Sequence, residues 1–380
     1  MTRISRFAVQ KNFLRTFSFL TVVALFVVLV GCGTNSNVTV INPPAGSAPS
    51  STITVGHEPM DVVACDLNGD SKTDLVVVNS ADNSLTILLG KGDGTFTAST
   101  LTSSGVSPVQ AACADFNGDG KADLAVVNEN SQSVSILIGN GDGTFNPGTS
   151  VFTGVGTQPS FIASADFNND GHADLIVTYK GGSTMAEILI GMGDGTFAYT
   201  TSDPVVGNPV NVAIGNFTGK VGETDIAFAD SLGKLNVSLG DGNGGFGTVV
   251  NTGISVGPYL AAADMNGDGK LDLVSSVGAV LLGNGDGTFT QAASGFAGDS
   301  FVAVGNFGSK QLGIAMIATN EAIVNVYSGN GDGTINQSGK TCSVGQNPRA
   351  IAVADFNGDG KADIAVASSF SNSVSIVLGQ

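Results

Sequence analysis

Residues 115–123 read DFNGDGKAD, and closely similar stretches recur along the chain. The same order of Asp, Asn, Asp and Asp occupies 66–74, 166–174, 264–272 and 355–363. Altered copies begin at Asn216 and Asn306. The seven first positions are spaced by 49, 51, 50, 48, 42 and 49 residues. Repeats of this length predict a propeller or a solenoid, in which each unit packs on its neighbours.

Each unit contains four short segments that read as strands. An apolar run precedes the motif, as in 351–354, and a second run follows it, as in 124–127. An alternating segment such as 133–138 leads into a glycine turn, GNGDGTF at 139–145, whose Phe we expect to pack between units. A more variable fourth segment, such as 150–153, completes the unit. Four strands per unit and no helical periodicity predict an all-β fold built of propeller blades.

The two ends of the repeat region complement each other. The seventh unit stops at Gln380, after its third strand, and a lone strand at 51–55 precedes the first unit. That strand can complete the last blade and close a ring. We therefore predict that residues 51–380 form a seven-bladed β-propeller of four-stranded blades.

The first 50 residues have a different character. Residues 1–15 hold four basic residues and no acid, and the apolar run 17–30 follows, which is typical of a secretory signal. The sequence LVGC at 29–32 resembles a bacterial lipobox, which implies removal of residues 1–31 and lipid attachment to Cys32. An uncleaved anchor, or an ordinary signal with a chance cysteine, is the alternative. Residues 32–50 are predicted to be a flexible tether.

The charge of the chain excludes some classes of partner. Lys and Arg number 15 against 32 Asp and Glu, a net charge of −17, so nucleic acid is not expected to bind, and the membrane is contacted through the lipid anchor only. The five complete motifs hold three Asp each, which is 15 of the 32 acids. The excess of acid is therefore mainly a property of the repeated motif.

The motif has the chemistry of a calcium loop. Its positions one, three, five and nine offer side-chain oxygens, and position seven can offer its carbonyl, which suits Ca²⁺. Val77 occupies the twelfth position of the first motif, where an EF-hand needs Glu. Zinc is disfavoured because His57 and His172 are the only histidines. Simple Asx-turns in tight connections are the alternative, although three carboxylates in one loop repel one another without a cation.

The repeats resemble the FG-GAP or VCBS repeats of integrin α-subunit propellers and of many bacterial surface proteins. The resemblance implies that the motif joins the first and second strands of each blade and that about five Ca²⁺ ions bind. The implied ligands are Asp66, Asn68, Asp70 and Asp74; Asp115, Asn117, Asp119 and Asp123; Asp166, Asn168, Asp170 and Asp174; Asp264, Asn266, Asp268 and Asp272; and Asp355, Asn357, Asp359 and Asp363. Lys72, Lys121, His172, Lys270 and Lys361 would contribute only their backbone oxygens.

Two units depart from the motif. The fourth keeps Asn216, Thr218 and Asp225 in an altered loop, and the sixth lacks the acids, so we expect no metal in either. The Asp of each glycine turn is expected to form the turn and not to bind metal; these residues are Asp93, Asp142, Asp194 and Asp286.

Cysteine usage leaves an alternative open. Cys65 and Cys113 lie in apolar stretches where the other repeats carry small or aliphatic residues. This favours two buried thiols, and a bridge between neighbouring repeats is the alternative.

The sequence favours binding over catalysis. No nucleophile–base pattern stands out, and both histidines are expected at the surface, so we expect no enzyme and no catalytic residues. The expected role is a monomeric ring on the bacterial outer membrane or cell surface that binds an extracellular protein or polysaccharide as an adhesion or interaction module. A lectin-like propeller is the alternative, weakened by the absence of Trp. A propeller associated with a hydrolase or lyase is the third reading.

Overall fold

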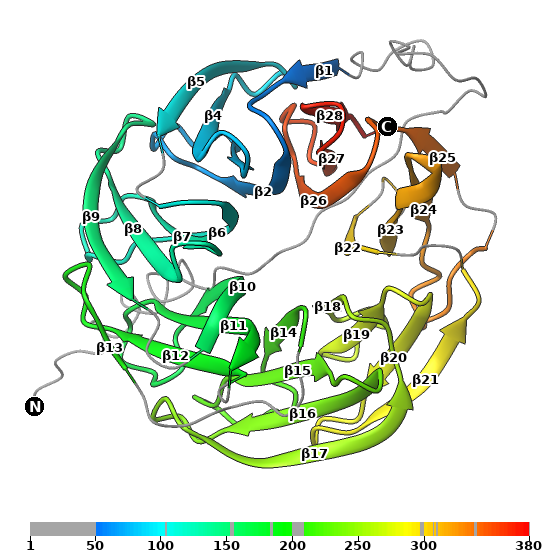
Figure 1. The fold of residues 1–380 in the computed structure, drawn as a ribbon. Coiled ribbons are helices and arrows are strands. Elements are labelled where there is room, and N and C mark those ends of the chain that lie inside the picture. Colours follow the sequence, from blue (N-terminus) through cyan, green and yellow to red (C-terminus); the bar gives the residue numbers. More distant parts are fainter. Residues whose placement is uncertain are drawn as a thin grey trace, which may run out of the picture.

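The computed structural model describes residues 51–102, 105–152, 156–182, 185–199, 209–296, 300–306, 308, 311–337 and 340–379. The predicted signal at 1–31 and the predicted tether at 32–50, with Cys32, lie outside these residues. The described chain forms seven four-stranded antiparallel sheets arranged as the blades of a ring (Figure 1). The predicted all-β, seven-bladed propeller is confirmed.

Blades 1 to 4 each use four consecutive strands. Blade 1 holds β2 (Pro59–Cys65), β3 (Asp74–Asn79), β4 (Ser84–Gly90) and β5 (Phe96–Thr102). Blade 2 holds β6 (Pro108–Ala114), β7 (Asp123–Asn128), β8 (Ser133–Gly139) and β9 (Phe145–Phe152). Blade 3 holds β10 (Gly156–Ala165), β11 (Asp174–Gly182), β12 (Ala186–Gly191) and β13 (Phe197–Tyr199). Blade 4 holds β14 (Val212–Gly215), β15 (Asp225–Ala229), β16 (Lys234–Gly240) and β17 (Phe246–Ser255).

The remaining blades bring the chain back to its beginning. Blade 5 holds β18 (Leu260–Ala263), β19 (Asp272–Ser275), β20 (Ala279–Gly283) and β21 (Phe289–Ser294). Blade 6 holds β22 (Val302–Asn306), β23 (Leu312–Ala318), β24 (Ile323–Tyr327) and β25 (Lys340–Ser343). Blade 7 holds β26 (Pro348–Ala354), β27 (Asp363–Ser368) and β28 (Ser373–Val377), and β1 (Ser51–Thr54) completes it. The predicted closure by the N-terminal strand is therefore confirmed, with Ser51 opposite Ile376 and Thr54 opposite Ser373.

The core lies between the blades as well as within them. The second strand of blade 1, β3, is buried at every residue, which explains its continuous apolar run. Apolar clusters join blade 1 to 2, 2 to 3, 3 to 4, 4 to 5 and 5 to 6, and one cluster spans blades 6, 7 and 1. Each blade thus buries its faces against its neighbours, as a ring requires.

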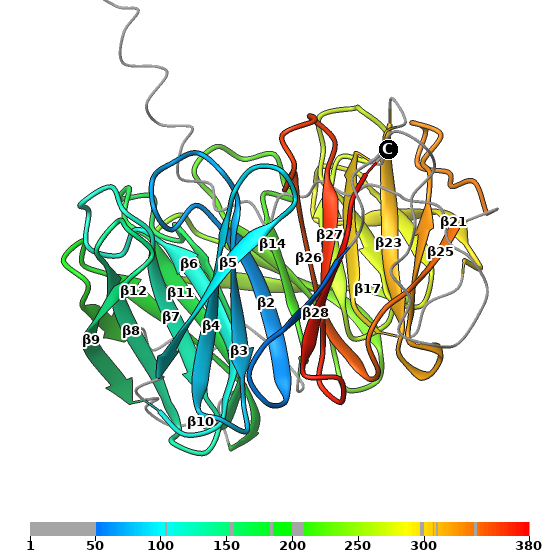
Figure 2. The same cartoon turned by 90° about the horizontal axis from the view of Figure 1, so that it is seen from above.

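The loops collect on two opposite faces of the ring, which Figure 2 shows from the side. Because the strands of a blade alternate in direction, the repeated motifs and the glycine turns lie on one face, here called the motif face. The connections from second to third strands and from blade to blade lie on the other, here called the opposite face. The one helical turn in the described ranges is a 3₁₀ turn, η1 (Thr319–Glu321). In the described part of the chain, no helix has the length and apolar character needed to span a membrane.

The structure corrects the expectation of two buried thiols. Cys65 at the end of β2 and Cys113 in β6 form a disulfide, with 6.6 Å between their Cα atoms. The two residues come close because the first strands of blades 1 and 2 are neighbours around the ring. The bridge therefore joins two blades across their interface.

Candidate metal loops

The five complete motifs form the loops between the first and second strands of blades 1, 2, 3, 5 and 7, as predicted. In blade 2 the residue before the motif, Ala114, pairs with its last residue, Asp123. Blade 1 has the same register between Cys65 and Asp74. The motif therefore begins directly after a residue that is paired with its ninth position. This register brings the first and ninth positions close together.

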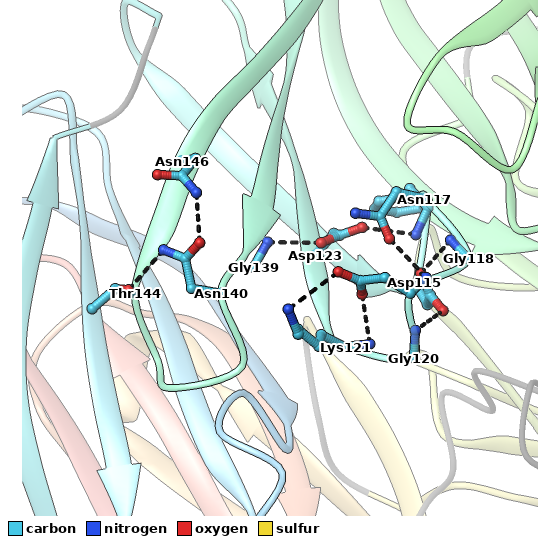
Figure 3. Close-up of polar contacts among 12 residues, drawn as sticks. Asp115, Asn117, Gly118, Gly120, Lys121, Asp123, Gly139, Asn140, Thr144 and Asn146 are labelled. Atoms are coloured by element: carbon cyan, nitrogen blue, oxygen red, sulfur yellow. Dashed lines mark hydrogen bonds and ion pairs between the residues drawn. The ribbon is translucent and has the colours of Figure 1, made fainter.

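The first three ligand positions organise the loop by accepting backbone N–H groups. In blade 2, the Asp115 carboxylate accepts from Gly118 and Gly120, each at 2.7 Å (Figure 3). The Asn117 side-chain oxygen accepts from Asp119 N at 2.9 Å. The Asp119 carboxylate accepts from Lys121 N at 2.9 Å. These bonds wrap the chain around the oxygens.

The ninth position is a buried clamp. Asp123 is fully buried, and its two carboxylate oxygens accept Phe116 N at 3.0 Å and Gly139 N at 2.7 Å. It therefore ties the start of the loop to the end of the third strand, as Figure 3 shows for Gly139. The same pair of bonds occurs at Asp74, Asp174, Asp272 and Asp363.

Burial makes the ninth carboxylate difficult to ionise alone. Burial, with a smaller contribution from the charges of the first and fifth Asp of the same loop, raises the pKa of Asp174 to about 6 and that of Asp363 to about 7. The pKa values of Asp74, Asp123 and Asp272 are raised for the same reasons. A cation beside these acids would favour their charged forms.

The donor set fits Ca²⁺ in chemistry. Each loop presents three carboxylates and an amide oxygen, and a carboxylate oxygen that accepts one N–H retains a lone pair for a cation. Among the residues that the structure describes, no three His, Cys, Asp or Glu side chains are already gathered as a metal site. Binding would therefore require the half-buried carboxylate at position one and the exposed carboxylate at position five to reorient, and calcium at these residues stays a prediction.

Position seven does more than offer a carbonyl. The Lys72 ammonium lies 3.0 Å from the Asp70 carboxylate, and Lys361 lies 2.9 Å from Asp359. Lys121 pairs with Asp119 at 3.4 Å. The sequence expectation of backbone oxygen alone missed these ion pairs, although a cation two residues after an acid is a visible signal. At His172 and Lys270 the backbone N–H donates to the fifth-position Asp, at 2.8 and 2.9 Å.

The fourth loop is closed by side-chain hydrogen bonds and an ion pair. Its Asn216 amide donates to the Lys220 carbonyl at 2.5 Å, and its oxygen accepts from the Thr218 hydroxyl at 3.3 Å. The Lys220 ammonium pairs with Glu223 at 3.0 Å. Asp225 keeps the buried clamp, accepting Phe217 N and Gly240 N, each at 2.9 Å. An amide donor and an ion pair thus occupy this loop at positions where the five complete motifs of the chain carry acids.

The sixth loop has lost the clamp. Gly313 pairs with Gly305 in the register that the ninth Asp and its partner hold elsewhere. The stretch 306–313 contains no Asp or Glu. The expectation of no metal in this unit is consistent with that composition and stays a prediction.

The glycine turns use their Asp as a turn former. In blade 1, the Asp93 carboxylate accepts from the Thr95 N–H at 2.9 Å and from the Thr95 hydroxyl at 2.6 Å. These bonds hold the pKa of Asp93 below its ordinary value. Four further turns repeat the arrangement, at Asp142, Asp194, Asp286 and Asp332. Each carboxylate is thus engaged within its own turn.

The glycine turns of blades 1 to 5 each dock on the motif loop of the neighbouring blade through a backbone hydrogen bond. Gly195 N in blade 3 donates to the Phe116 carbonyl of blade 2 at 2.9 Å. The Phe197 ring meets the Phe116 ring edge to face, with 5.6 Å between centroids. Similar ring pairs join Phe167 to Phe246, Phe217 to Phe289 and Phe356 to Phe96. The expectation that this Phe packs between units is confirmed.

The histidines lie at the surface, as expected. His57 is exposed, and its Nδ1 lies 2.9 Å from the Asp82 carboxylate on the opposite face. His172 is also exposed. The expectation that the ring is not an enzyme stays a prediction.

Comparison with known families identifies the repeat. A model described as an FG-GAP-like repeat matches residues 66–126, 115–177, 222–275 and 313–366. A second model, described as an FG-GAP repeat, matches residues 159–196. No curated protein matches the sequence.

Solved structures share the fold at low sequence identity. The BP39L lectin from Burkholderia pseudomallei is 16% identical over 86% of this chain and 98% of its own, with a TM-score of 0.62. BBS1N, solved in complex with ARL6DN, is 16% identical over 94% and 98% of the two chains, with a TM-score of 0.59. Kuenenia stuttgartiensis hydrazine synthase is 13% identical over 86% and 97%, with a TM-score of 0.54. These likenesses concern the fold alone.

Proposed function

The chain belongs to the FG-GAP-like repeat family, and on this premise we propose that it is a calcium-binding β-propeller that serves as an interaction or adhesion module and not as an enzyme. Its predicted lipid anchor at Cys32 would tether it to the bacterial outer membrane or cell surface. The partner would be an extracellular protein or polymer.

The distribution of apolar side chains supports a binding role. Among the described residues, eight large hydrophobic side chains are exposed, and five of them lie in loops of the opposite face. These five are Val106, Val210, Leu232, Val277 and Phe370, with Leu232 83% and Phe370 77% exposed. Apolar groups on loops of a rigid frame are the usual material of a recognition surface. This is the observation on which the proposed function rests.

The binding role can be tested with surface variants. Leu232→Ser and Phe370→Ser should abolish retention of an extracellular partner by the immobilised full chain. Val221→Ser is the matched control, because Val221 is fully exposed but lies in the fourth motif loop, on the other face. Partner retention that survives both changes, or that is lost equally in the control, would refute the assignment to the opposite face.

Calcium binding has its own experiment. Calorimetric titration of the full chain, stripped of metal with a chelator, should show about five sites. The same chelator should lower the midpoint of thermal unfolding, because an ion that binds only the folded state stabilises it. A flat titration with an unchanged midpoint would eliminate the calcium proposal.

Carbohydrate binding is the second candidate, and one side chain favours it. Tyr199 on the outer strand of blade 3 is 50% exposed, so its ring could stack against a sugar. Burial, and then the charge of Glu187, raises the pKa of Tyr199. Glycan-array binding that disappears in Tyr199→Ala would favour this function over protein recognition.

A further inference from the structure

The ring has one seam, between blades 7 and 1. There β1 pairs with β28 over four residues, and three of the four β1 side chains are exposed. Val55 N extends the pairing with a bond to the Asn372 carbonyl at 3.0 Å. Every other pair of neighbouring blades is joined by a continuous chain, whereas blades 7 and 1 are linked through β1 and otherwise meet in the apolar cluster that spans blades 6, 7 and 1. So short and exposed a strand is a weak closure by itself.

A second contact closes the seam on the motif face. Gly94 N in the glycine turn of blade 1 donates to the Phe356 carbonyl in the motif loop of blade 7, at 2.9 Å. The Phe96 and Phe356 rings meet edge to face, 5.7 Å apart. A Cβ at Gly94 would lie 2.9 Å from the Leu378 side chain, so the turn sits directly on blade 7. The seam is therefore fastened by the seventh motif loop as well as by β1.

The seventh loop controls the position of Phe356. This residue lies between Asp355 and Asn357, two of the predicted ligands. Its N–H donates to the buried Asp363 at 2.8 Å, and Asp363 also accepts Gly379 N at 2.5 Å. The Asp363 carboxylate thus holds both Phe356 in the motif loop and Gly379 at the end of the described chain.

We propose that the seventh motif loop is a calcium-dependent latch for the ring. This inference rests on the proposed calcium binding. With an ion present, Asp355 and Asn357 are fixed on both sides of Phe356, and the contacts of that residue with Gly94 and Phe96 are held. Without an ion, only Asp359 of the acids in this described loop is paired with a cation, the Lys361 ammonium, so the carboxylates of Asp355 and Asp363 repel each other and the seam opens more often.

The second motif loop provides a matched control. Its Phe116 makes the same two contacts, with Gly195 and Phe197, but it joins blades 2 and 3, which the chain already connects. The variants to compare are Asp355→Ala/Asp359→Ala in the seventh loop and Asp115→Ala/Asp119→Ala in the second. Each removes two predicted ligands and leaves the buried ninth Asp unchanged.

Hydrogen exchange of the full chain in saturating calcium tests the latch. Each variant should bind one ion fewer than the parent. In the seventh-loop variant, amides of β1, β28 and residues 91–96 should exchange about tenfold faster, because the seam opens more often. In the second-loop variant these amides should exchange at the parent rate, and residues 193–197 should exchange faster. Chelator added to the parent should reproduce the acceleration at the seam.

The outcomes separate the two proposals. Loss of one ion in the seventh-loop variant with unchanged exchange at the seam would overturn the latch and keep calcium binding. Equal acceleration of the seam in both variants would also overturn the latch. A parent chain that binds no calcium would overturn the proposed function itself. Should an alanine pair fail to fold, Asp359→Asn and Asp119→Asn give the same comparison with milder changes.

Discussion

Asp61 on β2 accepts a hydrogen bond from the backbone N–H of Ala111 on β6, with 3.0 Å between Oδ2 and the nitrogen. The bond joins the first strands of blades 1 and 2, and its acceptor is a buried carboxylate. In blades 2 and 4 the equivalent residues are the amides Gln110 and Asn211, and each accepts an N–H from the next blade at 3.0 Å. An uncharged acceptor therefore serves for this bond in blades 2 and 4, and the charge in blade 1 is an added cost.

Replacing this charge should stabilise the ring at high pH. Burial raises the pKa of Asp61 from 3.8 to about 6. A carboxyl whose pKa is higher in the folded state binds its proton more tightly there, so its ionisation costs stability as the pH rises from 4 to 6. Asp61→Asn should raise the free energy of unfolding by about 2 kcal/mol at pH 8 and change it little at pH 4.

Urea unfolding of parent and variant at both pH values checks this. Gln110→Glu is the reverse control, because it places an acid at the equivalent position and should destabilise at pH 8 more than at pH 4. An Asp61→Asn effect of the same size at both pH values would show that ionisation of Asp61 is not the cause.

The disulfide should contribute strongly to stability. Cys65 and Cys113 are 48 residues apart, and a cross-link over such a loop restricts the unfolded chain by about 4 kcal/mol in the loop-entropy model. Cys65→Ala/Cys113→Ala should therefore lower the midpoint of urea unfolding. Amide hydrogen exchange should become faster at the interface of blades 1 and 2. Each single variant should lose as much as the double one, since either breaks the bridge. An unchanged midpoint in the double variant would contradict the cross-link.

The repeats made the fold predictable because the structure of a blade is local. Alternating strands, glycine turns and the nine-residue motif each follow from residues close in sequence. The period of the motif along the chain then gives the number of blades. The closing strand was also predictable, since Ser51–Thr54 and the three-stranded last unit complete each other. The position of the motif between first and second strands followed from the family resemblance.

Contacts between blades were harder to predict. The bridge between Cys65 and Cys113 depends on which positions of adjacent first strands face each other, and the spacing of two cysteines does not carry that information. The bond from Asp61 to the next blade has the same origin. The ion pair of Lys72 with Asp70 also depends on how the loop folds, whereas the motif spacing by itself predicts only a backbone role for Lys72.

The clamp at position nine can be tested apart from calcium in the fourth loop. Asp225 is fully buried and accepts three backbone N–H groups, from Phe217, Thr218 and Gly240. Asp225→Asn would point an N–H₂ group at one of these donors, so the free energy of unfolding should fall by about 2–4 kcal/mol. The loss should be the same with calcium and with chelator.

Asp264→Asn in the fifth loop is the contrasting variant. Asp264 is a predicted first-position ligand that accepts only from its own loop, at Gly267, Asp268 and Gly269. Its substitution should weaken stabilisation by calcium and have less effect in chelator than Asp225→Asn. A calcium-dependent loss in Asp225→Asn would mean that the fourth loop binds metal after all.

The ring pairs between blades should couple neighbouring units energetically. Phe116 is 1% exposed and packs edge to face on Phe197 of the next blade. Phe116→Ala should cost about 3–5 kcal/mol, whereas Phe370→Ala, at a side chain 77% exposed, should stay within about 0.5 kcal/mol. A double-mutant cycle of Phe116→Ala with Phe197→Ala should give a coupling of about 0.5–1.5 kcal/mol. A coupling of zero in urea unfolding would mean that the two rings act only by filling space.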